Sequence, residues 1–442
     1  MKNKNWLAVF LILTTVLLYY RSFLTYFIGG DDIWLYLSAP DSFSHVVKLF
    51  SDIGGTYRPI PFSLFRIYWL FGTNVQLMHI IPIILHCLNT VLIYFLLQRF
   101  NQSKLASGIV SLAYGFSHIV FFDVFTLTGL VDQIFILFFL LSLCCFFNKR
   151  TALSLVFFIL TIFCKESFIS LTIILTAAWL IFPRSEKHPV FLEKVTPGVT
   201  VLLTGIYLAF KLVFYRQQGS AYSYIFNLKT LLNNLFDYGL WLINWRHGWQ
   251  MGMPFSPDKF YDVFSFIYLL LLIFAVIKTF KTNKKVFVFA LVFGLAGLVP
   301  FYFLGRALTF YLEISLIGLC ILLAGYVKTC RRKNLVFALL LFLTFYFSIN
   351  IKTQWLEYSH AARGVQLAKT YFDQVVQAYD WNQHDQLCLV AFNDDYVWAT
   401  AVGQELNMFF KRADGKKIEI VLVPDEAGLL DCSEQSLVVK QE

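Results

Sequence analysis

The chain has 442 residues, of which 58% are hydrophobic and only 14% are charged. This composition excludes an ordinary soluble globular protein, in which about 25% of residues are charged. It indicates a protein that crosses a membrane many times. The formal net charge of +9 comes mostly from basic residues between apolar stretches, so it reports membrane orientation rather than a nucleic-acid partner.

The apolar stretches predict the transmembrane helices. The first stretch follows Lys2 and Lys4 and has no small-residue cleavage site before Asp31, so we expect an uncleaved signal anchor with a cytoplasmic N-terminus. Later stretches have about the length needed to cross a hydrocarbon core of roughly 30 Å. Eleven helices are predicted, at residues 6–28, 76–98, 104–121, 127–147, 151–165, 167–182, 195–215, 263–279, 285–304, 307–327 and 334–351.

Basic residues predict the orientation of these helices. They cluster in alternate short loops, near residues 99–104, 149–150, 184–194, 278–285 and 328–333, and these loops are expected to be cytoplasmic. An odd number of crossings then places the C-terminus outside. The stretch Leu228–Trp245 is also apolar, but counting it as a crossing would move the 278–285 cluster outside. We therefore predict an amphipathic helix in the membrane interface there.

The transmembrane domain is predicted to span residues 1–351 and to carry two outer loops, at 29–75 and 216–262. The first loop should contain a helix from Asp41 to Phe50, capped by Asp41 or Ser42, and a helical piece at 62–71. Its apolar content suits a loop that lies on the membrane.

The remaining residues, 352–442, have the composition of a soluble domain. Their pattern predicts a small α/β extracytoplasmic module. It should contain a helix to about Tyr379, strands at 386–392, 417–423 and 436–440, and a helix at 394–410.

Cysteine usage gives little chemistry. Five of the eight cysteines lie in apolar stretches, and none has the spacing of metal ligands. Cys388 and Cys432 both lie in the C-terminal module, where a disulfide and two free thiols are both open alternatives. The sequon Asn101-Gln102-Ser103 falls on the cytoplasmic side, which favours a bacterial cell over a secretory-pathway organelle.

Two adjacent carboxylates, Asp31 and Asp32, follow Gly29-Gly30 at the outer mouth of the first helix. Charges at such a place are costly and usually have a partner or a task. Other charged residues are expected to converge there by topology, among them Arg58, Asp123, Asp132, Lys165, Glu166 and Arg306. Cations beside carboxylates suit a lipid phosphate with a general base. The alternatives are snorkelling to headgroups and, for Lys165-Glu166, a solvated hairpin.

Motifs in about the first 180 residues resemble those of a known family. The motifs are Asp31-Asp32, Tyr57-Arg58-Pro59-Ile60, Phe65-Arg66, His79, His86-Cys87-Leu88-Asn89-Thr90, Ser117-His118 through Asp132, and Cys164-Lys165-Glu166-Ser167. They are similar to motifs of the multi-spanning protein O-mannosyltransferases that carry tetratricopeptide repeats. More broadly, they resemble the C-type (GT-C) membrane glycosyltransferases that use polyprenyl-phosphate sugars. The repeats are absent here, and Leu130 stands where the family has an arginine.

The resemblance implies an all-α, GT-C-like membrane fold whose first outer loop supplies the catalytic residue, here Asp31 or Asp32. It also implies donor-phosphate binding by Lys165 and Arg58, to which we add Arg306 from the outer charges. Supporting roles are expected for Glu166, His118 and Asp132.

The expected reaction is a single inverting displacement, with Asp31 preferred as the base because it stands nearer the membrane. For Asp32, orientation of the acceptor and binding of a divalent ion are alternative roles. No cofactor is required, and a metal is not favoured because two adjacent carboxylates alone are a poor cage for magnesium. The partners would be a polyprenyl-phosphate-linked sugar, a protein, lipid or glycan acceptor, and the bilayer.

A transporter or flippase of lipid-linked sugars is the alternative function, because it would share the apolar composition and the outer basic residues. Such a transporter should show an internal repeat and helices interrupted near the middle of the membrane. The sequence has no clear repeat. A third reading, a membrane scaffold that displays the C-terminal module, leaves the outer charges unexplained.

Overall fold

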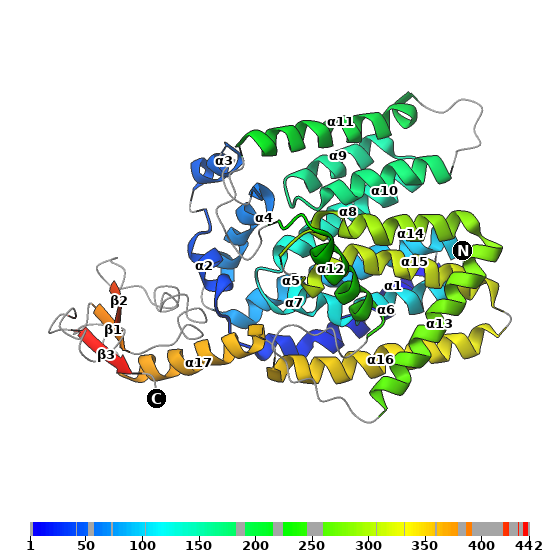
Figure 1. Cartoon of the computed structure of the whole chain (residues 1–442). Coiled ribbons are helices and arrows are strands. Elements are labelled where there is room, and N and C mark those ends of the chain that lie inside the picture. Colours follow the sequence, from blue (N-terminus) through cyan, green and yellow to red (C-terminus); the bar gives the residue numbers. More distant parts are fainter. Residues whose placement is uncertain are drawn as a thin grey trace.

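A computed structural model describes residues 3–40, 42–51, 57–71, 74–101, 103–182, 191–214, 224–244, 260–305, 307–330, 332–358, 360–378, 386–390, 419–423, 432 and 436–440. Apolar helices run side by side through most of the molecule (Figure 1). They are α1 (Asn3–Tyr20), α5 (Val75–Asn101), α6 (Lys104–Gly115), α8 (Leu130–Phe147), α9 (Thr151–Ile162), α10 (Phe168–Ile181), α11 (Phe191–Phe214), α13 (Tyr261–Thr282), α14 (Lys284–Leu298), α15 (Glu313–Thr329) and α16 (Lys333–Tyr358).

The described residues contain seven helices that are long and apolar enough to cross a membrane, or eight if the bent pair at 104–115 and 118–125 forms one span. Helices α9 and α10 and the stretch 196–210 of α11 are apolar but shorter. A multi-pass membrane protein is therefore supported, and the count of eleven crossings stays a prediction. Helix α16 continues to Tyr358, beyond the end predicted for the last span.

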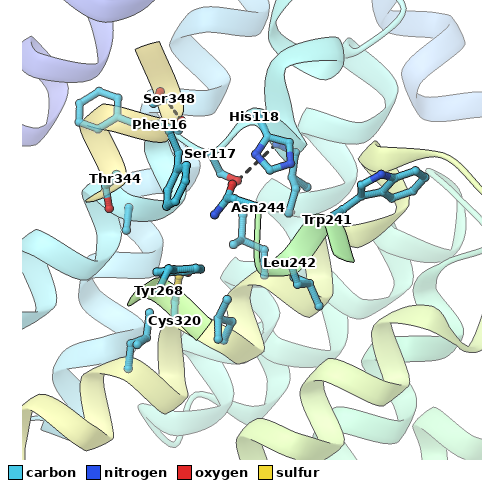
Figure 2. Close-up of a pocket in the computed structure, with 16 residues that line it drawn as sticks. Phe116, Ser117, His118, Trp241, Leu242, Asn244, Tyr268, Cys320, Thr344 and Ser348 are labelled. Carbon is cyan, nitrogen blue, oxygen red and sulfur yellow. Dashed lines mark hydrogen bonds between the residues drawn. The ribbon is translucent and has the colours of Figure 1, made fainter. Parts of the chain in front are cut away.

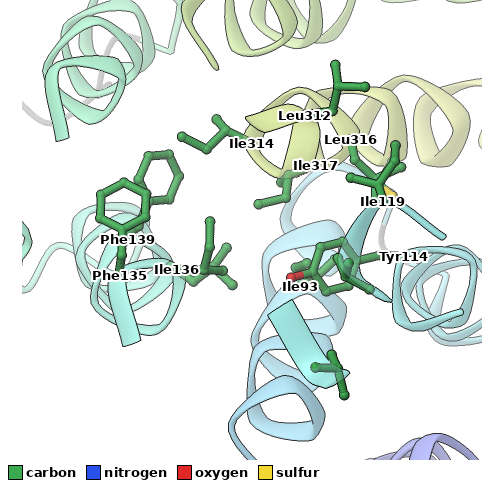
Figure 3. Packing of buried hydrophobic residues seen from close by; sticks show 14 of the residues in the cluster. Ile93, Tyr114, Ile119, Phe135, Ile136, Phe139, Leu312, Ile314, Leu316 and Ile317 are labelled. Atoms are coloured by element: carbon green, nitrogen blue, oxygen red, sulfur yellow. The ribbon is translucent and has the colours of Figure 1, made fainter. Parts of the chain in front are cut away.

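The core lies between α5, α6, α8 and α15. The spans of α15, α8 and α5 are 78%, 67% and 61% buried within the protein, whereas those of α1, α13 and α16 are 22%, 28% and 33% buried. Figure 3 shows Ile93, Tyr114, Ile136 and Ile317 from these four inner helices meeting in the core. The outer helices therefore present apolar side chains outward, as helices that face lipid do.

Short helices fill the first outer loop: α2 (Asp31–Leu37), α3 (Phe43–Ser51), α4 (Pro59–Leu64) and the 3₁₀ helix η2 (Phe65–Phe71). The predicted helix at 41–50 is confirmed as α3, and Ser42 Oγ accepts a hydrogen bond from the backbone N–H of His45 at 3.2 Å. The piece predicted at 62–71 is divided between α4 and η2. Helix α2 was not predicted.

In the second outer loop, α12 (Leu228–Leu242) confirms a helix at the predicted position. The side chain of Asn227 caps it by accepting from the N–H of Thr230 at 2.7 Å. Its placement in the membrane interface stays a prediction.

The C-terminal residues form α17 (His360–Ala378) and three strands, β1 (Gln386–Val390), β2 (Glu419–Val423) and β3 (Ser436–Lys440). All pairs are parallel in the order β2-β1-β3, and Leu387 lies opposite Ile420 and Leu437. A disulfide joins Cys388 of β1 to Cys432. The strands lie where they were predicted, and the helix predicted at 394–410 lies outside the described residues. That these elements form a separate extracytoplasmic domain stays a prediction.

Candidate functional site

The two aspartates at the start of α2 face different surroundings. Gly30 precedes them with a φ of 53°, in the left-handed region that glycine adopts most readily, and α2 begins at the next residue. Asp31 is exposed, whereas Asp32 is only 3% exposed. Asp32 Oδ1 accepts a hydrogen bond from the backbone N–H of Thr128 at 2.8 Å. The structure thus separates one surface carboxylate from one buried carboxylate.

Burial also changes how Asp32 titrates. Loss of hydration raises the pKa of Asp32 to about 7, although the backbone N–H groups of Thr128 and Leu127 lower it by donating to the carboxylate. The nearby charge of Asp31 raises the pKa further. Asp32 therefore changes its charge near neutral pH.

The turn that receives Asp32 leads directly into α8. Thr126 Oγ1 accepts hydrogen bonds from the Gly129 N–H at 3.2 Å and from Thr128 Oγ1 at 3.0 Å. Gly129 lies so close to the preceding α7 (Phe121–Phe125) that an added Cβ would be 2.1 Å from the carbonyl oxygen of Asp123. This close approach requires glycine. Asp132 follows in the first turn of α8.

The loop between α9 and α10 contributes a buried lysine. Only 4% of the Lys165 side chain is exposed, and its ammonium forms an ion pair with Asp132. Three aromatic rings lie around Nζ, with centroids at 5.4 to 6.0 Å; they belong to Phe301 of η5 (Val299–Phe301) and to Phe310 and Tyr311 of η6 (Thr309–Leu312). Aromatic faces attract a cation, most strongly where water is excluded. The alternative of a solvated hairpin is therefore wrong for Lys165.

Glu166 joins the same loop to the first outer loop. Its Oε1 lies 3.0 Å from Arg58 Nη2, and the two side chains are 23% and 21% exposed. Arg58 directly precedes α4, and the backbone N–H of Ile60 donates to the carbonyl of Phe163 at 3.3 Å. Side chains and backbone together hold the two loops side by side. The residues Arg58, Lys165, Glu166 and Asp132 therefore lie in one region, as was predicted for the outer charges.

Two further carboxylic residues lie behind Lys165. Asp123 is fully buried, and neither of its carboxylate oxygens has a hydrogen-bond partner. Glu313, in the first turn of α15, is 2% exposed and accepts a hydrogen bond from the hydroxyl of Tyr114. Both act electrostatically on one another and on the Lys165–Asp132 pair. The sequence placed Asp123 among the converging outer charges without a catalytic role. It did not single out Glu313, although a glutamate within an apolar stretch is itself a signal.

Within the part of the chain that the structure describes, no group of three or more His, Cys, Asp or Glu residues is placed to hold a metal ion. Cations beside carboxylates suit the neutralisation of a phosphate and the acceptance of a proton.

His118 lies apart from these charges. It starts the 3₁₀ helix η3 (His118–Val120) and forms a hydrogen bond with the side chain of Asn244 just beyond α12 (Figure 2). The cavity beside it, lined also by Tyr268, Cys320 and Phe347, holds about 40 Å³, room for a few water molecules. Helix η3 contacts η6, the helix that carries two of the aromatic rings around Lys165. Arg306 lies outside the described residues.

No protein family matches this chain in a search of known families, and no curated protein matches its sequence at a significant level. The resemblance to GT-C enzymes therefore rests on the short sequence motifs alone.

The close approach at Gly129 predicts a selective loss of stability. Gly129→Ala should lower the free energy of unfolding by about 1–3 kcal/mol, because the new methyl group overlaps the backbone of α7. Gly108→Ala in α6 is the matched control, since nothing lies within 4 Å of its added Cβ, and it should be neutral or slightly stabilising. Thermal unfolding of both variants in detergent measures the difference. Equal melting temperatures would contradict the close approach.

The buried carboxyl group of Asp32 predicts a pH dependence. Its pKa of about 7 in the folded protein lies above its ordinary value of 3.8, so between these values the folded state binds more protons than the unfolded state. Stability therefore falls as pH rises through this range. Asp32→Asn keeps an oxygen for the Thr128 N–H but does not titrate. The melting temperature of the variant relative to the parent should rise with pH and level off above about pH 7; parallel pH profiles would refute the assignment.

Proposed function

We propose that the protein is a GT-C-like membrane glycosyltransferase that moves a sugar from a polyprenyl phosphate to an acceptor hydroxyl outside the cytoplasm. The observation that carries the proposal is the position of the loop between α9 and α10, which the Arg58–Glu166 pair joins to the first outer loop and the Lys165–Asp132 pair joins to the start of α8. Asp132 lies in the first turn of α8, and the backbone just before this helix binds Asp32. Cations and acidic residues that the family motifs single out therefore belong to one continuous arrangement.

The cations suit the leaving group of such a reaction. Breaking the bond between the sugar and the phosphate leaves negative charge on the lipid phosphate, and fixed cations in a site of low dielectric stabilise that charge strongly. Lys165 is held in such a site by Asp132 and by the rings of η5 and η6. Arg58 is more exposed and offers a planar group with several donors.

The carboxylates suit the attacking group. Asp31 is exposed and is proposed as the base, whereas Asp32 is buried and holds the turn before α8. The acceptor oxygen attacks the anomeric carbon as the carbon–oxygen bond to phosphate breaks. The hydroxyl proton goes to Asp31, and the lipid phosphate leaves with the bonding electrons. The configuration at the anomeric carbon is inverted.

The Cys388–Cys432 disulfide supports an outer location for the C-terminal residues, because disulfides persist in oxidising compartments and are rare in the cytoplasm. With the N-terminus in the cytoplasm, we infer a multi-pass protein of a bacterial cell membrane. The first outer loop then lies on the same side as the C-terminal strands.

Transport of a lipid-linked sugar is the second candidate function. The buried side chains of Asp123 and Glu313 favour it, because ionisable groups inside a membrane often line a path for protons or ions. The two functions differ in their products. Purified protein incubated with polyprenyl-phosphate sugars and acceptor extracts should release lipid phosphate, detected by mass spectrometry, if it is a transferase. Movement of intact donor between leaflets without release would support transport.

The base assignment predicts the effect of Asp31→Asn. The amide keeps the size of the side chain but does not take up a proton, so turnover should fall by about 10²- to 10⁴-fold with donor affinity nearly unchanged. Asp32→Asn should cost less, because its role is to hold a turn. Transfer assays and donor titrations on both single variants and on the double variant make the measurement. Activity that survives in the double variant would remove this mechanism.

The buried cation predicts a loss of donor affinity. Lys165→Ala should weaken donor binding by about 10- to 100-fold, because it removes a charge-assisted contact to phosphate. Lys369→Ala is the control, since Lys369 also pairs with an aspartate but stands half exposed on α17. Donor titration and thermal unfolding are measured together. A Lys165→Ala variant that loses stability but keeps its donor affinity would assign the ion pair to folding alone.

A further inference from the structure

Helix α3 of the first outer loop turns three apolar side chains away from the protein. Phe43, Val47 and Phe50 are 83%, 52% and 40% exposed. Their spacing of four and three residues places them on one face of the helix. Val46 and Leu49 lie on the neighbouring face and are partly buried. The exposed apolar face is therefore distinct from the face that packs on the protein.

The edge of α3 opposite Val46 and Leu49 is polar. Ser44 and Lys48 are exposed there, and Lys48 lies in the last turn of the helix. A short helix with one apolar face and a lysine at its polar edge has the composition of helices that lie in the membrane interface.

Contacts place α3 at the level where α9 ends. The ring of Phe50 lies 5.7 Å, centroid to centroid, from that of Phe163 in the α9–α10 loop. The Tyr57 hydroxyl donates to the carbonyl of Phe50 at 3.0 Å, and its ring also contacts Phe163. Helix α9 presents an apolar outer stripe along its length, made of Leu153, Val156 and Ile159. The apolar face of α3 thus continues the lipid-facing surface of α9.

A second part of the same loop has the same character. Leu70 of η2 is 81% exposed, and Trp69 beside it is 37% exposed. The Trp69 indole donates to the carbonyl of Tyr36 at 3.0 Å, and the guanidinium of Arg66 lies 5.0 Å from its ring. Tryptophan and arginine side chains in this arrangement are typical of the boundary between lipid tails and headgroups.

We propose that α3 is an interfacial membrane helix: Phe43 and Val47 insert between lipids of the leaflet on the side of the first outer loop, and the Phe50–Phe163 contact holds the Lys165–Glu166 loop at headgroup depth. The bilayer is the occupant because the exposed face continues a lipid-facing stripe and borders a basic edge. Insertion of α3 into the bilayer does not depend on which reaction the protein performs. A test of the insertion is therefore independent of the glycosyltransferase proposal.

Photocrosslinking tests the insertion. The photoreactive residue p-benzoylphenylalanine is placed at position 43, 47 or 48, and the full-length protein is irradiated in phosphatidylcholine–phosphatidylglycerol nanodiscs. Intact-mass analysis should find adducts of one phospholipid about tenfold more often at positions 43 and 47 than at 48. Position 159 on α9 is the positive control for lipid contact. Equal yields at 43 and 48, a crosslink to a second copy of the chain, or no adduct at 43 while 159 reacts would each overturn the insertion.

Hydrogen exchange tests the coupling to the site. In nanodiscs, the double variant Phe43→Ser/Val47→Ser should increase backbone exchange in residues 163–167, since α3 no longer fixes Phe163 at the interface. Ser44→Ala, on the polar edge, is the control and should leave this exchange unchanged. Unchanged exchange in the double variant would show that insertion does not hold the loop.

Discussion

The ion pair between Lys165 and Asp132 is the contact on which the rest of the site depends. An ammonium removed from water loses several kcal/mol of hydration, which only a close carboxylate and favourable surroundings offset. Asp132 supplies the carboxylate, and the rings of η5 and η6 supply faces that attract a cation. Loss of either charged partner would leave the other buried and uncompensated. The loop after α9 and the start of α8 must therefore form together.

From this pair the contacts extend in two directions. Next to Lys165, Glu166 binds Arg58 and so holds the first outer loop. Before Asp132, the glycine-dependent turn at 126–129 offers its backbone to Asp32. One cation thus fixes the position of both the second cation and the acidic start of α2. The different exposures of Asp31 and Asp32 follow from this arrangement, because only one of two adjacent helical residues can point toward the turn.

Much of the helical framework could be predicted from the sequence, because apolar stretches and caps are local signals. Helices α3 and α12 and the three strands lie where their patterns indicated. The length of the apolar stretches was a weaker guide to the number of membrane crossings. Helices α9 and α10 have 12 and 14 residues, short of the roughly 20 that a full crossing uses.

The site was less predictable than the framework. The pair Gly29-Gly30 predicted the end of the first helix, so the start of α2 at Asp31 was not predicted. Which aspartate is buried depends on where that helix begins. The partner of Glu313 is Tyr114, 199 residues earlier, so no local pattern connects the two. Contacts of this kind are set by how the helices pack, which the motifs alone do not specify.

The Arg58–Glu166 pair also has a consequence for biogenesis, because its partners are 108 residues apart. The ribosome completes the first outer loop well before α9 and α10 emerge. During that interval Arg58 has no contact with the carboxylate of Glu166, because that residue has not yet been synthesised. Closure of the site is therefore a late event in membrane insertion, because it requires α9, α10 and the loop between them that contains Lys165 and Glu166.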